Sequence, residues 1–72
     1  MIIPLAFAEK NKIFTIREIT GRPKNRITLM EKGFCVGRQI SLKNSAMGSF
    51  VVELGGSQYI IDFTYAKNIL VD

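Results

Sequence analysis

Three basic side chains are crowded into five residues, and the chemistry that they favour is the recognition of anions. Arg22, Lys24 and Arg26 lie where a short helix is expected to begin, close to Pro23. The amino end of a helix has unpaired N–H groups and a partial positive charge, so cations there repel it. An anion or an acidic surface would relieve that repulsion. Two interpretations stay open: a solvated basic face, and a docking site for an acidic surface on a partner.

Aromatic side chains in the second half of the chain could stack on the bases of a nucleic acid. The alternation of the sequence instead predicts that Phe50, Tyr59 and Phe63 face inward with the aliphatic residues. Tyr65 is less constrained, and we single it out as the aromatic candidate for a contact surface. The basic residues are spread along the chain and do not line one strand, so we expect no nucleic-acid partner.

Catalysis and metal binding have few residue types to draw on. The chain has no histidine and one cysteine, which excludes an internal disulfide and the usual zinc sites. Cys35 has no histidine to activate it, and we predict that it fills a small apolar space. Glu53 and Asp62 could pair as acid and base across a hairpin, but nothing in the sequence fixes them together. We therefore predict no enzyme activity, no cofactor and no metal site.

The length of 72 residues predicts a single domain, residues 1–72, and the net charge of +4 favours acidic partners in general. The opening, MIIPLAFAEK, lacks the basic start of a signal peptide and is interrupted by Pro4, so we interpret it as the lead-in to the fold. No stretch approaches the ~20 apolar residues of a membrane span, so we expect no membrane insertion. One lone thiol suits the reducing cytoplasm.

A strand and a helix are expected to position the basic cluster. Residues 12–19 alternate and are rich in β-branched and aromatic side chains, which predicts a strand. Residues 23–32 then predict a helix of about three turns, on which Ile27 and Met30 form an apolar stripe that Leu29 widens. Gly33 fits the position just after the helix, where glycine adopts a left-handed conformation at little steric cost.

The rest of the chain repeats short alternating segments that are separated by glycine turns. Strands are predicted at residues 38–45, 49–54 and 58–63, followed by one helical turn at TYAK and a last strand at 68–71. About five short strands, with one short helix after the first, predict a mainly β, strongly bent small barrel. Gly37 and Gly48 would form its corners.

This pattern resembles the FeoA family, the small ferrous-iron transport protein A of bacteria. The resemblance covers nearly the whole chain and rests on LMEKGFCVGRQISL and MGSFVVELGGSQYIIDFTYAKNILV. The positions that match the family pattern are mostly structural: Leu29, Glu31, Gly33, Phe34, Gly37, Ile40, Gly48, Val52, Leu54, Gly56, Ile61, Ala66, Ile69 and Val71.

Four positions depart from the family pattern. Lys32 stands where a leucine is usual, and Val36 and Ser49 each replace a proline at a turn. These three lie at turns or at a helix end. Asp62 stands where an arginine is common, which reverses a charge and puts any carried-over role of that position in doubt.

The resemblance implies an SH3-like barrel and a cytoplasmic accessory protein without catalysis of its own. Its partner would be FeoB, a membrane ferrous-iron transporter with a cytoplasmic GTPase domain. Arg22, Lys24, Arg26 and Tyr65 are the candidate contact residues for that partner. Two alternatives remain: a domain like the C-terminal SH3-like domain of iron-dependent repressors, and a small nucleic-acid-binding barrel.

Overall fold

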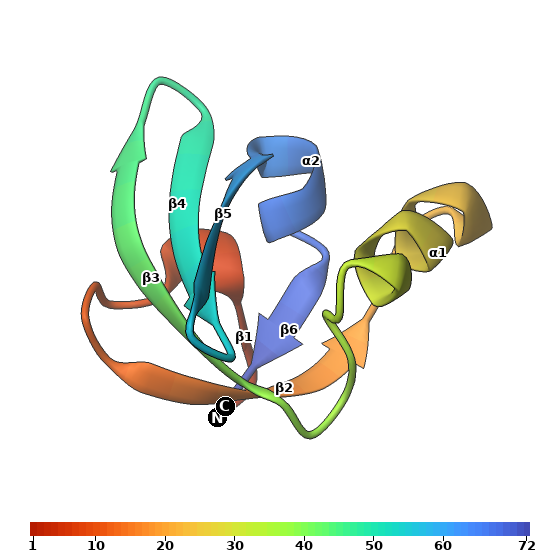
Figure 1. Ribbon diagram of the computed structural model, residues 1–72, viewed down its shortest axis with the longest axis horizontal. Helices are drawn as coiled ribbons and strands as arrows, with labels where there is room; N and C mark the ends of the chain where they lie inside the picture. The colour runs from red at the N-terminus through yellow and green to blue at the C-terminus, as the bar shows by residue number, and fades with distance from the viewer.

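A single bent strand, β2 (Ile13–Ile19), organises the fold by belonging to two parts of one sheet. Its first half pairs with β3 (Gln39–Ala46), and its second half pairs with β6 (Ile69–Val71), both antiparallel. A bulge interrupts the second pairing between Ile16 and Glu18, where the strand changes direction. The computed structural model describes all of residues 1–72, and Figure 1 shows β2 curving beneath the other strands.

The remaining strands extend this sheet on both sides. A meander of β3, β4 (Ser49–Leu54) and β5 (Ser57–Asp62) is joined by two-residue turns at Met47–Gly48 and Gly55–Gly56. On the other side β6 pairs with β1 (Ile3–Pro4), which gives the strand order β1-β6-β2-β3-β4-β5. Both turns have positive φ at each central residue, as tight hairpins with a right-handed twist require.

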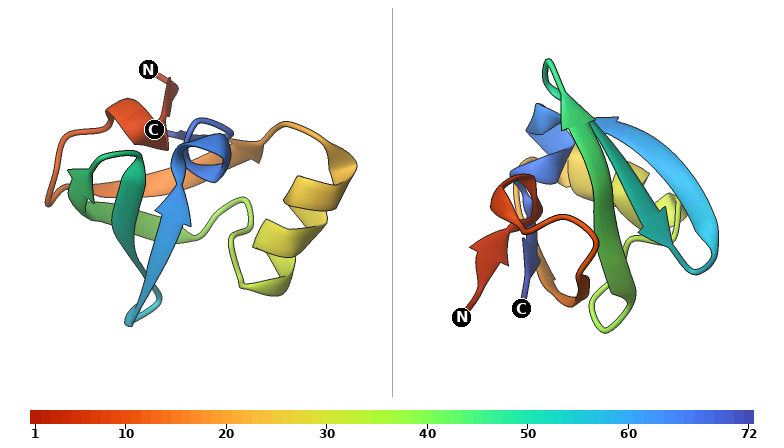
Figure 2. Two further views of the ribbon diagram at one scale, coloured as in Figure 1. Left: turned by 90° about the horizontal axis from the view of Figure 1, so that it is seen from above. Right: turned by 90° about the vertical axis from the view of Figure 1, so that its left-hand side faces the viewer.

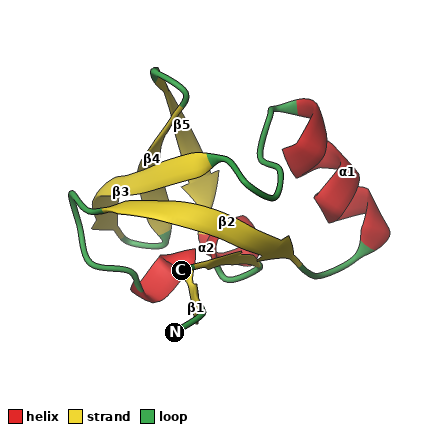
Figure 3. Ribbon diagram, turned by 90° about the horizontal axis from the view of Figure 1, so that it is seen from below, coloured by secondary structure: helices red, strands yellow, loops and turns green.

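Three short helical segments complete the chain. A 3₁₀ helix at Leu5–Phe7 follows β1, α1 (Pro23–Glu31) follows β2, and α2 (Phe63–Ala66) joins β5 to β6. Figure 2 shows that α1 lies beside the barrel and not across it. Figure 3 shows the strands folded over one another, with α1 at the side.

One apolar core fills the inside of the bent sheet. Phe34, at its centre, is fully buried and packs edge-to-face on Tyr59, with ring centroids 5.2 Å apart. The other buried apolar residues come from every strand except β1, from the three helical segments and from the loop after the first of them: Leu5, Ala8, Ile16, Leu29, Ile40, Leu42, Phe50, Val52, Leu54, Ile61, Ala66, Ile69 and Val71.

The expected mainly β, strongly bent barrel is confirmed, with one strand more than expected. The additional strand is β1, which precedes the first expected strand, so α1 follows the second strand in the order of the chain. The predicted turns and the inward alternation of β4 are also as expected, since Phe50, Val52 and Leu54 are buried. Gly33 ends α1 with φ +98°, because its N–H donates to Met30 O and that of Phe34 donates to Leu29 O.

Four positions that were predicted to be inside are exposed. Ile27 and Met30 are 55% and 58% exposed, and Leu29 alone of α1 is buried. Phe63 is 43% exposed, because the chain leaves the strand at Asp62 and the alternation of β5 stops there. Cys35 is exposed, since the turn at Gly33 directs Phe34 inward and the next residue outward.

Candidate functional site

The start of α1 holds the predicted basic cluster without any compensating acid. Arg22 is the N-cap residue and Pro23 the first helical one, and no side chain caps the free N–H groups. The first turn carries no acidic residue. Arg22, Lys24 and Arg26 are exposed, and none takes part in the four ion pairs of the structure. This end of the helix is therefore an uncompensated positive region.

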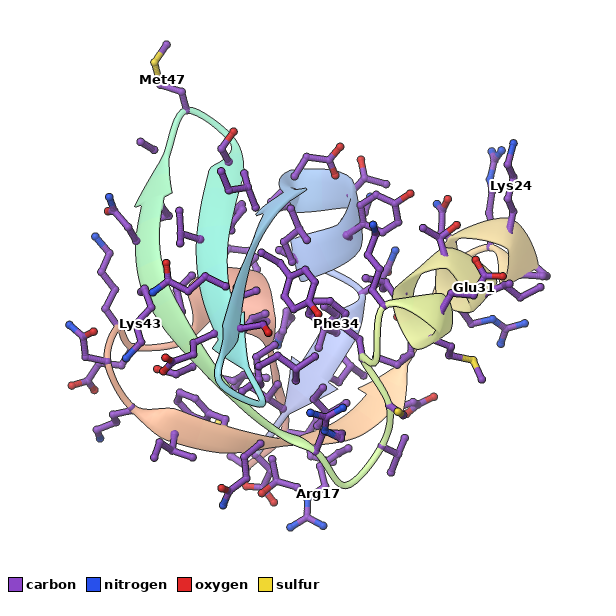
Figure 4. All side chains as sticks on the ribbon, in the orientation of Figure 1. Arg17, Lys24, Glu31, Phe34, Lys43 and Met47 are labelled. Atoms are coloured by element: carbon purple, nitrogen blue, oxygen red, sulfur yellow. The ribbon has the colours of Figure 1, made fainter.

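The three cations do not share one face of the helix. Arg26 lies on the part of α1 that also carries Pro23, Ile27 and Met30, since all four line one groove. Lys24 lies on another side, and Figure 4 shows it projecting into solvent from the far end of α1. The cluster predicted from sequence is thus close in the chain but divided in space.

Arg26 lines an apolar groove between α1 and the end of β2. The groove has a volume of about 590 Å³, and α1 forms one wall. Ile19, at the end of β2, and Cys35 and Val36, in the loop after α1, contribute to the other side. Val36 is 63% exposed. Sequence reasoning missed this groove because it expected Ile27 and Met30 to face the core.

Tyr65, in α2, faces the side of α1 opposite the groove, and the fold does not bring it together with Arg22, Lys24 or Arg26. It is half-buried and packs against the core. With Thr28 and Lys32 of α1 and Ile60 of β5, it lines a smaller depression of about 300 Å³. Its role as a partner contact stays a prediction.

A third depression is lined by Arg38, Ser41 and Gly55 among others, and no sequence signal pointed to it. Arg38 donates from Nη1 to the carbonyl oxygen of Gly33 at 3.2 Å and also lies against Gly55. Ser41, in β3, is buried, and its hydroxyl has no hydrogen-bond partner. The Arg38 side chain therefore bonds to the residue that ends α1 and lies against the turn between β4 and β5.

The residues that could have supported catalysis or metal binding lie apart. Glu53 is opposite Gln58 in the hairpin and pairs with Lys43 at 3.5 Å, whereas Asp62 is opposite Ser49 at the other end. No group of three His, Cys, Asp or Glu residues is close enough to hold a metal ion. None of the helices combines the length and the apolar composition that a membrane-spanning helix requires.

The bent sheet, whose two parts are joined by β2 and enclose one core, defines the chain as an SH3-like barrel. A manganese-dependent transcriptional repressor shares this fold with a TM-score of 0.90 at 14% identity, over 97% of this chain and 40% of that one. The manganese regulator SloR shares it with a TM-score of 0.83 at 12% identity, over 97% of this chain and 34% of that one. At these identities the likeness concerns the fold alone.

The sequence identifies the family within that class. The FeoA domain matches residues 3–72, so this chain belongs to the FeoA family, whose members are accessory proteins of ferrous-iron transport. No match is found among curated proteins.

Two solved structures of FeoA type are similar to the chain over nearly its whole length. An iron uptake regulatory protein (FeoA) has a TM-score of 0.90 at 25% identity, over 100% of this chain and 96% of that one. A FeoA-like protein from Clostridium acetobutylicum has a TM-score of 0.87 at 25% identity, over 99% and 85%. The family and the SH3-like fold that the sequence resembles are thereby confirmed.

Proposed function

We propose that this protein is cytoplasmic and supports the uptake of ferrous iron by docking onto a FeoB-type membrane transporter. Docking would alter the gating of the transporter or its nucleotide turnover. The observation that carries the proposal is the match of the FeoA domain to residues 3–72. A protein similar over the full length of the chain is described as an iron uptake regulatory protein, which fits a regulatory role.

The surface chemistry supports a role in protein contact. SH3-like folds commonly recognise other proteins through surface grooves. Here α1 carries unpaired cations at its start and exposed apolar side chains along one side. Exposed apolar groups beside polar ones are typical of protein–protein contact sites.

Uptake and binding test the proposal together. A strain that lacks this protein is expected to take up less ferrous iron than its parent, and a plasmid-borne copy should restore uptake. The purified protein is also expected to bind the cytoplasmic GTPase-bearing part of the transporter in calorimetry. Unchanged uptake in the deletion strain would contradict the proposal, and so would the absence of binding.

The repressor-like alternative is consistent with the shared fold, which has a TM-score of 0.90 with the manganese-dependent repressor. In that role the domain would contribute ligands to a metal ion. Titration of the purified protein with Mn²⁺ or Fe²⁺ separates the two roles. Tight binding of either ion would favour the alternative, and the absence of binding would favour docking. The chain would have to hold the ion largely through oxygen ligands, because it has no histidine.

A further inference from the structure

The side of α1 that lines the groove is largely apolar, whereas the same side of a fully solvated helix would be polar. Pro23, Ile27 and Met30 are three or four residues apart and so lie on one side of the helix, and Arg26 lines the same groove. Ile27 and Met30 are each more than half exposed, and Leu29 is the only buried residue of α1. The fold therefore leaves an apolar helical side without a partner.

The groove beside this side of α1 has firmly placed walls. The loop that carries Cys35 and Val36 begins at the helix end, where Phe34 N–H donates to Leu29 O at 2.9 Å. The loop then rejoins the barrel where Gly37 N–H donates to Ile16 O at 2.8 Å. Because both ends of the loop are bonded, the groove is formed before any partner arrives, which limits the entropy lost on binding.

The charges along the groove differ between its two sides. Arg26 lies on the α1 wall without an ion-pair partner, and the positive amino end of α1 adds to its field. Glu18 lies on the β2 side, also without an ion-pair partner. An occupant that places a carboxylate against Arg26 would satisfy the helix start, which has no acid of its own.

We propose that this groove binds an amphipathic segment of the partner, with apolar side chains inserted against Ile27, Met30 and Val36 and a carboxylate on Arg26. This inference rests on the proposed function, in which the partner is the transporter. A nucleic acid would not supply apolar anchors. A second copy of this chain would bring the cationic starts of two α1 helices to the same contact.

Cys35 offers a direct measurement of occupancy. It is the only cysteine of the chain, it is exposed, and it lines the groove. The rate at which N-ethylmaleimide alkylates Cys35 is expected to fall when the cytoplasmic part of the transporter is added at saturating concentration. An equal rate with and without bound transporter would overturn the groove as the docking site.

Matched substitutions test the same site without relying on the thiol. Met30→Asp and Arg26→Glu are each expected to raise the Kd for the transporter fragment by about tenfold or more. The controls are Met47→Asp, at the exposed tip of the β3–β4 hairpin (Figure 4), and Lys10→Glu, an exposed cation without an ion-pair partner. Circular dichroism and thermal unfolding of all four variants verify their fold.

The outcomes separate the groove from the proposed function. If the transporter fragment binds the wild-type protein but Met30→Asp and Arg26→Glu bind equally well, the groove is wrong and the docking role stands. If the fragment does not bind the wild-type protein at all, the docking role and the groove fall together. A dimer of the protein alone that Met30→Asp dissociates in light scattering would assign the groove to a second copy and overturn the proposal.

Discussion

At the scale of single residues, Asp62 shows how a departure from the family pattern is accommodated. The resemblance to the family pattern predicted an arginine at this position, and the local sequence offered no reason for a carboxylate. In the structure Asp62 is the N-cap residue of α2, and its Oδ1 accepts a hydrogen bond from Tyr65 N–H at 3.2 Å. The carboxylate thus satisfies one of the free N–H groups of the helix start.

Replacement of Asp62 by alanine is expected to lower the free energy of unfolding by about 1 kcal/mol, because the cap is lost. Asp62→Ser should retain most of the stability, since a serine hydroxyl can accept the same hydrogen bond. Urea denaturation of the three proteins measures the difference. Equal stability of Asp62→Ala and the wild type would show that the cap contributes nothing in solution.

At the scale of elements, the orientation of α1 is set at its carboxyl end. The hydrogen bonds that end the helix place Leu29 and Phe34 together in the core. Buried contacts between these two positions commonly accompany this type of helix end. The apolar stripe at Ile27 and Met30 therefore stays out of the core and lines the groove beside β2, although its spacing alone predicted burial.

The contrast between two neighbouring residues tests this orientation. Leu29→Ala is expected to lower the free energy of unfolding by about 2–5 kcal/mol, because it leaves a cavity in the core. Met30→Ala is expected to change it by no more than about 0.5 kcal/mol, as is usual at exposed positions. Chemical denaturation of both variants measures the two values. A large loss from Met30→Ala would mean that the helix is rotated.

Strands and turns could be predicted from the sequence because their signals are local. Period-two alternation fixes which side chains of β4 face inward, and the glycines at Gly33 and Gly48 mark turns that need positive φ. β1 was missed because a two-residue strand has no periodicity, and its partner β6 is distant in the sequence. The apolar groove was missed because it depends on how α1 packs against the barrel, which the sequence pattern of α1 does not determine.

At the scale of the whole molecule, apolar burial and not ion pairing holds the barrel together. The core is one continuous cluster, whereas all four ion pairs are formed by side chains that are at least a third exposed. Exposed ion pairs contribute little, because water and salt screen them. The net charge of +4 also adds a weak repulsion that salt reduces.

Stability should therefore depend little on salt. Raising NaCl from about 0.05 M to about 0.5 M is expected to change the free energy of unfolding by less than about 1 kcal/mol. Any change should be an increase, since screening weakens the repulsion between unpaired cations. Denaturant titrations at the two salt concentrations measure it. A clear loss of stability at high salt would show that an ion pair contributes more than its exposure indicates.

The pairing of β1 with β6 brings the two ends of the chain side by side, with the Met1 amino group 3.2 Å from the Asp72 carboxylate. In Figure 1 both ends lie under the barrel, away from the exposed tip of α1. A tether attached at either end would therefore hold the molecule in nearly the same attitude. On a sensor chip, or fused to a carrier, the protein would present that helix to the solution whichever end is attached.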